Sequence, residues 1–317
     1  MKESTKEQLT AWALLSPTVV VLGLFGLFPI AYAVFVSLHA WRIKKGAFVG
    51  LEHYANALAD GQLLNGFKVT VFYALGTIPL EIGLSLALAY LLFKALSGKG
   101  FFRVLYFLPY VTPMIATAVV YRSIFSAHPA SPANRLGELF GYEPQRWLFE
   151  SRSIVALLLE AFDVTSYPDW VNSAFPSLAL VSIIVYNVWV YVGYDTVILL
   201  AGLSAIPKHY YEAAAIDGAT GLQSFRHITL PLLSPALFFI SLISFIGTFK
   251  AFNHIYIMRT AGARDTVDVV SVVIFDQVYQ YHDAGNAATL ALILFVVILI
   301  LTVGQSRLLG RRVFYGD

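Results

Sequence analysis

The chain has 317 residues, of which 58% are hydrophobic and 13% are charged, and its mean hydropathy is +0.71. Soluble globular domains carry about one quarter charged residues, so this composition excludes a soluble protein and predicts an integral membrane protein. The net charge of +2 is too small to indicate a nucleic-acid partner. The absence of cysteine excludes disulfides and thiolate metal ligands.

Six apolar stretches are each long enough to cross the hydrocarbon core of a membrane, which takes roughly 20 helical residues. They lie at 14–38, 69–93, 104–125, 178–203, 232–258 and 287–308. Because they are long and do not alternate with a period of two, they predict an all-α protein with six transmembrane helices. The first stretch is too long for the apolar part of a signal peptide, so we expect it to be retained. With no linker or repeat visible, a single domain over 1–317 is predicted.

The charges beside the spans predict that both termini are cytoplasmic. In that orientation Lys6, Arg226 and Arg307 lie inside, whereas most acidic residues lie outside, although Arg42 and others run against the trend. The longest outside loop is then 126–177. The three leucines at 157–159 are too few to cross the membrane, and they predict a short amphipathic helix at the outer surface.

The segment 206–231 is too long for a simple turn between two helices and is not loop-like in composition. Pro207 suits the first turn of a helix, and Gly218 suits the left-handed conformation that ends one. A second helical piece follows at 222–229. The sequence therefore predicts a helix–turn–helix elbow in the cytoplasm that docks on a partner. The alternative is a pair of helices lying on the membrane surface.

This segment resembles the cytoplasmic signature loop of binding-protein-dependent ABC importer permeases. The residues that carry the resemblance are Glu212, Ala213, Ala214, Asp217, Gly218, Ala219, Gln223, Phe225, Ile228, Leu230, Pro231 and Pro235. The resemblance implies that the loop is a coupling helix docking in a cleft of an ATPase subunit. The coupling positions it implies are Glu212, Ala213, Ala214, Asp217, Gly218, Ala219, Leu230 and Pro231.

Further residues resemble the first permease of sugar importers, such as those for maltose and glycerol-3-phosphate. They are Pro17, Pro29, Ser37, Trp41, and the stretches 48–54, 108–113 and 146–148. Two stretches depart from that pattern: 260–263 replaces a Thr-Gly-Gly-Pro turn, and 150–177 looks like an insertion at the contact with a binding protein. The resemblance implies a multi-pass protein of the bacterial or archaeal inner membrane. Its implied partners are a second permease, two ATP-binding subunits, an external solute-binding protein and membrane lipid.

Two predicted spans carry polar faces. Asn187, Tyr191 and Tyr194 share one face of the fourth, and Ser244 and Thr248 share one face of the fifth. Taken alone, such faces are also typical of helix–helix packing, which is the favoured interpretation for the fifth span. The resemblance implies instead that they line a path for a sugar, together with further positions. The complete implied set is Asn187, Val190, Tyr191, Tyr194, Ser244, Gly247, Thr248 and Met114.

Three charged residues, Glu81, Asp195 and Lys250, fall within or at the ends of the predicted spans, and the sequence assigns no role to them. We expect Lys250 to reach the membrane interface. The chain has no phosphate-binding glycine loop and no zinc-ligand spacing. We therefore expect no enzyme activity and no cofactor or metal in this chain, with ATP and Mg²⁺ held by a partner ATPase.

The predicted function is an importer permease for a sugar, oligosaccharide or polyol. Two alternatives stay open at this point. The same machinery could carry glycerophosphate or another small anion, or the chain could be a secondary carrier.

Overall fold

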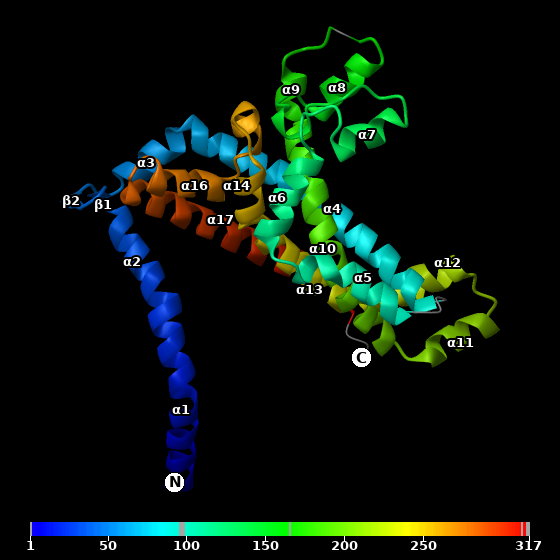
Figure 1. Ribbon diagram of the computed structural model, residues 1–317. Coiled ribbons are helices and arrows are strands. Elements are labelled where there is room, and N and C mark those ends of the chain that lie inside the picture. The colour runs from blue at the N-terminus through cyan, green and yellow to red at the C-terminus, as the bar shows by residue number, and fades with distance from the viewer. Residues whose placement is uncertain (1, 95–98, 165, 312, 315–317) are drawn as a thin grey trace. The chain divides into compact units, whose positions relative to one another are not determined.

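A computed structural model describes residues 2–94, 99–164, 166–311 and 313–314. These residues form two compact units, Met1–Leu63 with Val273–Val296 (unit 1) and Leu64–Val272 with Val297–Asp317 (unit 2). The helices are α1 (Lys2–Leu22), α2 (Phe28–Ser37), α3 (Glu52–Ala59), α4 (Gly61–Lys94), α5 (Lys99–Val111), α6 (Met114–Ile124), α7 (Pro132–Glu138), α8 (Ile154–Ala161), α9 (Trp170–Ala174), α10 (Leu178–Ala205), α11 (Lys208–Ile216), α12 (Gly221–Ser224), α13 (Leu230–Phe249), α14 (Asn253–Met258), α15 (Arg264–Val267), α16 (Val270–Tyr279) and α17 (Ala284–Gly310) (Figure 1). The single domain predicted over 1–317 stays a prediction.

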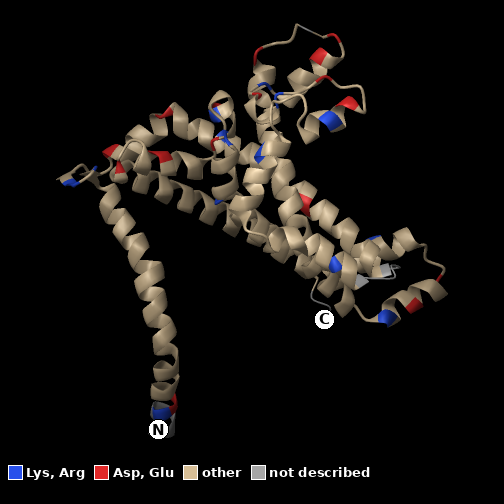
Figure 2. Cartoon of the chain, viewed as in Figure 1, with Lys and Arg blue, Asp and Glu red and all other residues tan. Residues whose placement is uncertain are grey.

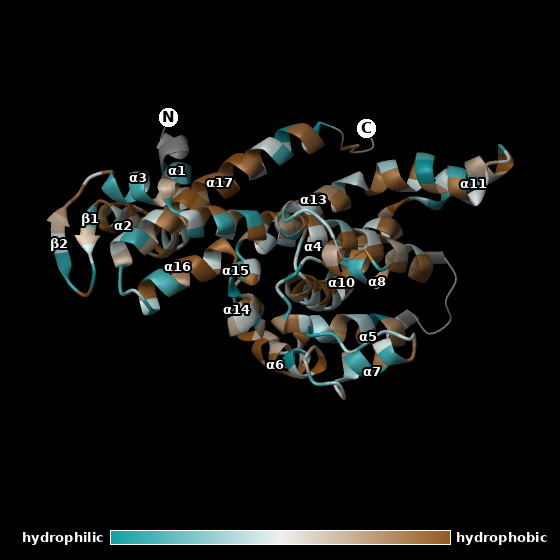
Figure 3. Cartoon of the chain, turned by 90° about the horizontal axis from the view of Figure 1, so that it is seen from above, coloured by the Kyte–Doolittle hydropathy of each residue, from teal (hydrophilic) through white to brown (hydrophobic). Residues whose placement is uncertain are grey.

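Among the described residues, five helical stretches are long and apolar enough to cross a membrane, and a bent pair makes a sixth candidate. The five are Lys6–Ser37, Gly61–Phe93, Leu178–Ala205, Gly221–Phe249 and Ala284–Gly310. Apolar residues predominate on α17, whereas polar ones are frequent on α11 (Figure 3). The all-α class predicted from composition is confirmed by this architecture.

Unit 1 contains α1, α2, α3 and a short antiparallel hairpin, β1 (His39–Trp41) paired with β2 (Lys45–Phe48). The hydroxyls of Ser37 and Tyr54 lie 2.8 Å apart and tie the end of α2 to α3. From Leu9 to Leu22, most of the large apolar side chains of α1 are exposed, as an apolar solvent permits.

Unit 2 is built around α10, in which 61% of the residues of the most apolar stretch are buried. Towards one end of α10, Ile183 and Tyr186 pack with Ile255 and Met258. Towards the other end, Leu199 and Leu203 pack with Leu92 and Leu233 from the flanking helices. The helices α4, α13 and α14 therefore each pack against this one central helix.

Two predicted spans differ from the helices in the structure. The stretch predicted at 104–125 is two helices, α5 and α6, that meet at 94°. The break falls at Thr112-Pro113, where proline lacks an amide hydrogen and disfavours a helical conformation in the preceding residue. The fifth span, predicted to reach residue 258, ends at Phe249, and α14 follows as a separate helix. The Ala251 carbonyl between them accepts a hydrogen bond from Ser271.

Residues 126–177 form a small folded segment at one end of unit 2, opposite α11 and α12 (Figure 1). Asn134 organises α7 by donating to the carbonyls of His128 and Gln145 and accepting from the Trp147 indole at 2.6 Å. The leucines at 157–159 lie on α8, so the short helix predicted there is present. Lys, Arg, Asp and Glu gather at the two ends of unit 2, and few lie on the helices between them (Figure 2).

Acidification is expected to loosen the α8–α9 part of this segment. Burial opposes ionisation of the Glu150 carboxyl, but hydrogen bonds and charge from Arg152 outweigh burial and hold its pKa below the usual 4.5. A carboxyl whose pKa is lowered by folding stabilises the fold at higher pH, and this stabilisation is lost as the pH falls from about 4.5 through the folded-state pKa. Hydrogen exchange of the amides in 150–177, corrected for its intrinsic pH dependence, should therefore rise below pH ~4.5.

The control is a pair of glutamine variants. Glu150→Gln should remove most of this pH dependence, whereas Glu143→Gln, at an exposed acid of the same segment, should keep it. Equal behaviour of the two variants would show that the Glu150–Arg152 pair does not hold the segment.

Candidate functional site

A pocket of about 320 Å³ opens among the helices of unit 2, close to the middle of α10. Its walls come from α4, α5, α6, α10, α13 and the start of α14. The residues that line it are Glu81, Tyr110, Met114, Asn187, Tyr191, Tyr194, Asp195, Ile243, Ser244, Gly247, Thr248, Lys250, Ala251, Phe252, Asn253 and His254. A volume of this size suits a small solute.

Seven of the eight positions predicted to form a substrate path meet in this pocket: Met114, Asn187, Tyr191, Tyr194, Ser244, Gly247 and Thr248. Val190 does not, because it is 3% exposed and lies in the core cluster that contains Ile183. The break between α5 and α6 places Met114 at the first turn of α6, on the pocket wall. Contact of these side chains with a solute stays a prediction.

The floor of the pocket is a buried polar cluster centred on Glu81 of α4. The Asn187 amide donates to Glu81 Oε2 at 3.3 Å, and the Ser244 hydroxyl donates to Glu81 Oε1 at 2.9 Å. The Asp195 carboxyl is also buried and lines the same pocket. An acid within a membrane protein requires polar partners, and here Asn187 of α10 and Ser244 of α13 supply them.

Aromatic rings and a histidine complete the walls. The rings of Tyr110 and Tyr194 stack with centroids 4.4 Å apart and planes 20° apart. His254 is 3% exposed, and its Nε2 lies 2.7 Å from the Tyr73 hydroxyl. Sequence reasoning missed Tyr110 and His254 as pocket residues. The sequence gives no signal for His254, because the predicted fifth span includes this residue and continues past the helix break at Lys250.

The elbow predicted at 206–231 is present as α11, a turn, and α12 continued by one π-helical turn at Phe225–Thr229. Pro207 occupies the position that caps α11, and Gly218 has φ +74°, the left-handed conformation predicted for it. Thr220 and Gln223 form a reciprocal capping box at the start of α12. The Tyr211 hydroxyl lies 3.1 Å from that of Thr229 and joins the two arms.

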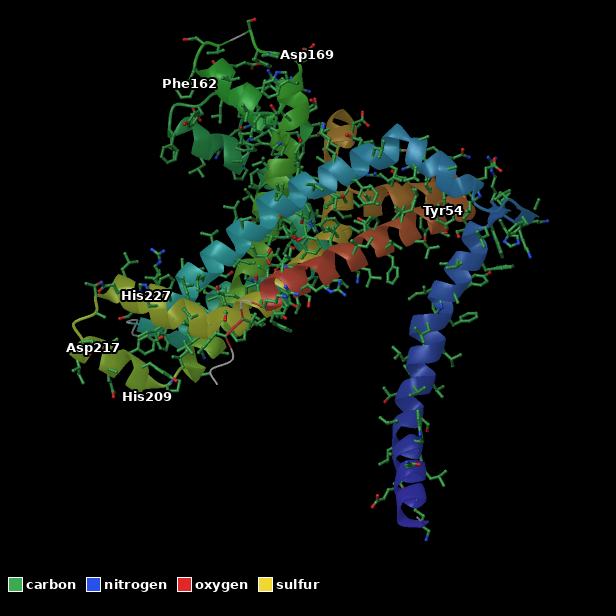
Figure 4. The ribbon with its side chains drawn as sticks, turned by 180° about the vertical axis from the view of Figure 1, so that it is seen from behind. Tyr54, Phe162, Asp169, His209, Asp217 and His227 are labelled. Carbon is green, nitrogen blue, oxygen red and sulfur yellow. The ribbon has the colours of Figure 1, made fainter. Side chains whose placement is uncertain are left out.

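The predicted coupling positions divide between the tip and the base of this elbow. Glu212, Ala213, Asp217 and Gly218 are exposed, and Ala214 and Ala219 are partly covered. Leu230 and Pro231 are partly buried where the chain enters α13. Two large apolar residues point into the surroundings, Ile216 at 87% and Leu222 at 76% exposure. His209, Asp217 and His227 mark this end of unit 2, and Phe162 and Asp169 mark the α8–α9 end (Figure 4).

The pocket offers hydrogen-bond donors and acceptors beside aromatic faces, which suits reversible binding of a polar solute rather than bond chemistry. Within the described ranges, no three His, Cys, Asp or Glu side chains are grouped to hold a metal ion.

Comparison with known proteins gives the family. Residues 80–315 match the family described as the inner membrane component of binding-protein-dependent transport systems. The chain is 27% identical, over 94% of its length and 92% of the relative's, to the trehalose/maltose transport system permease protein MalF of Thermococcus litoralis. It is 26% identical, over 96% of both, to the sn-glycerol-3-phosphate transport system permease protein UgpA of Agrobacterium fabrum.

A solved structure has the same fold. It comes from a bacterial ABC transporter involved in the import of the acidic polysaccharide alginate, with a TM-score of 0.77, 19% identity and 98% coverage of both chains. The family match covers the pocket, the elbow and most of the helices. Members of this family are membrane transport subunits and not enzymes, as the sequence predicts. The chain therefore belongs to the family of binding-protein-dependent transport system inner membrane components, the permeases of ABC importers.

Proposed function

We propose that this chain forms, with a second permease, the path by which an ATP-driven importer moves a carbohydrate across the inner membrane. The observation that carries the proposal is the pocket, in which residues of α6, α10 and α13 that are distant in sequence converge. Amide, hydroxyl and carboxyl groups there match the hydroxyls of a sugar, and the Tyr110–Tyr194 pair offers ring faces to its C–H surface.

The relatives support the same substrate class. One is named for trehalose and maltose, and others for arabinooligosaccharides and lactose. The second candidate is a small anion such as glycerophosphate, which the name of another relative and Lys250 on the pocket wall both favour. Family membership removes the reason to consider a secondary carrier.

The two ends of unit 2 suit two different partners. The exposed tip of the elbow, with Ile216 and Leu222, suits docking on an ATPase subunit that holds ATP and Mg²⁺. The α7–α9 segment at the opposite end suits contact with an external solute-binding protein, the partner that gives the family its name. In this orientation both termini are cytoplasmic. The proposal is therefore that the elbow docks on the ATPase, and not that it lies flat on the lipid surface.

Uptake by cells that lack the natural chain tests this function. We expect the wild-type chain to restore uptake of a labelled neutral disaccharide rather than of glycerol-3-phosphate. Asn187→Leu should lower that uptake about ten-fold, because it removes a pocket amide and leaves Glu81 Oε2 unpaired. Val197→Leu, an exposed position on the same helix, should transport normally.

The contrary result is equally clear. If the wild-type chain restored glycerol-3-phosphate uptake alone, the carbohydrate proposal would be wrong. If Asn187→Leu and Val197→Leu transported equally well, the pocket would not be the path.

A further inference from the structure

The floor of the pocket holds two carboxyl groups, and no cation of the described residues forms an ion pair with either. Ion pairs within the described ranges include Arg152 with Glu150 and Glu160, and Arg259 with Asp268. Neither Glu81 nor Asp195 is among them, although they are only 3% and 2% exposed. Acids within a membrane protein are costly unless a countercharge or proton meets them. A proton, a cation of the second permease or the solute can supply the missing countercharge.

A second observation concerns hydrogen bonding rather than charge. Two buried polar atoms on the pocket wall have no hydrogen-bond partner among the described residues: Asp195 Oδ2 and His254 Nδ1. His254 comes from α14, and its other ring nitrogen is already held by Tyr73. Buried polar atoms are normally satisfied. Two unsatisfied atoms in one cavity point to a ligand that carries polar groups towards both.

The charges around the pocket are unevenly placed. Both oxygens of the Glu81 carboxyl accept hydrogen bonds, from Asn187 and Ser244, which is the pattern of an ionised carboxylate, so the Glu81–Asp195 pair carries negative charge. Lys250 caps the end of α13 and is exposed, so its ammonium group reaches water. The remaining ionisable groups on the wall are His254 and the tyrosines Tyr110, Tyr191 and Tyr194. The buried floor is thus negative, and Lys250 lies at the exposed end of α13.

We propose that Glu81 and Asp195 form a charge filter that receives a protonated amino group of the solute. The pocket then prefers amine-bearing carbohydrates to neutral ones, and disfavours those that carry a carboxylate or phosphate. The inference rests on the proposed carbohydrate path and names the substrate class within it. The ammonium group supplies the countercharge that the floor lacks and a donor for Asp195 Oδ2.

A single introduced thiol measures the charge of the floor directly. The chain contains no cysteine, and a side chain at Gly247, on the pocket wall one turn from Ser244, meets nothing within 4 Å. The Gly247→Cys chain, in the whole importer in membrane vesicles, is treated with cationic, anionic and neutral methanethiosulfonates. The thiolate displaces methanesulfinate and forms a mixed disulfide. Mass spectrometry of the peptide that carries the introduced thiol gives each rate without interference from thiols of other subunits.

The ratio of the cationic to the anionic rate is the readout, because thiolate reactivity cancels in it and the neutral reagent reports access. Glu81→Gln should lower this ratio about ten-fold, which corresponds to ~1.4 kcal/mol. Asp195→Asn should lower it too, and Lys250→Gln should raise it. If neither Glu81→Gln nor Asp195→Asn changed the ratio by more than about two-fold, the charge filter would be refuted.

Protection by sugars of equal size tests the solute class. Glucosamine should slow the reaction of the introduced thiol more than glucose does, and glucuronate should protect least. Glu81→Gln should erase the difference between glucosamine and glucose. Equal effects of the three sugars, or a stronger effect of glucuronate, would overturn the preference for amines. Failure of the path itself would look different, because then no reagent, neutral or charged, would reach the thiol in the Gly247→Cys chain.

Discussion

Alanine at position 193 is expected to prevent assembly of a functional permease. Gly193 lies on α10 against α5, and a Cβ built there would overlap the backbone carbonyl oxygen and carbonyl carbon of Tyr106. Both atoms belong to backbone, so no side-chain rotation relieves the overlap and the two helices must separate. Overpacking of this kind costs about 1–3 kcal/mol or more. We expect little detergent-stable protein, and any that is recovered should have a clearly lower thermal aggregation midpoint.

Gly83→Ala on α4 is the matched control. A Cβ at Gly83 meets no atom within 4 Å, and alanine has the higher helix propensity. Its aggregation midpoint should equal or exceed that of the wild-type chain. A Gly193→Ala chain as stable as Gly83→Ala would show that α5 and α10 are not packed as closely as the structure places them.

Valine at position 218 is expected to abolish uptake while leaving the membrane helices folded. Gly218 has φ +74°, where a residue with a side chain is disfavoured by roughly 1–2 kcal/mol and a β-branched one by more. Strain at this turn changes the angle between α11 and α12 and moves the exposed tip that is proposed to meet the ATPase. The measurements are solute uptake and the thermal midpoint of the purified chain.

Gly218→Asn separates the turn geometry from the loss of glycine itself, because asparagine tolerates the left-handed conformation. We expect uptake to persist in Gly218→Asn and to be lost in Gly218→Val. Cross-linking refines the result: an Ile216→Cys chain should link to an ATPase subunit, whereas Phe162→Cys at the other end should not. Normal uptake by Gly218→Val, or no link from the Ile216→Cys chain, would show that the elbow takes no part in coupling to the ATPase.

The helices that cross the membrane were predictable from local composition, because a hydrocarbon solvent requires about 20 apolar residues wherever the chain crosses it. The elbow was predictable for a related reason. Pro207 and Gly218 act through their own backbone geometry, and the capping pair Thr220 and Gln223 lies three residues apart. Signals that act within a few residues along the chain can be recognised without knowledge of tertiary contacts.

The predicted third span shows where local signals fail. Hydropathy is continuous across 104–125, yet Thr112-Pro113 breaks the helix by 94°. Proline is tolerated within other membrane helices of this chain, such as Pro79 in α4, so its presence alone does not predict a break. Whether a proline bends a helix depends on what packs around the freed carbonyls.

By itself, then, the sequence determined the all-α membrane class and the elbow, and with the family resemblance it identified seven of the sixteen residues that line the pocket. Only the tertiary structure showed that Glu81 of α4 lies between Asn187 and Ser244, in the same pocket as Asp195. It also showed that Val190 lies in the core and that His254 lies on the pocket wall. The reason is physical. A helical period shows which residues share one face, but the hydrogen bonds that satisfy a buried acid come from other helices more than 100 positions away.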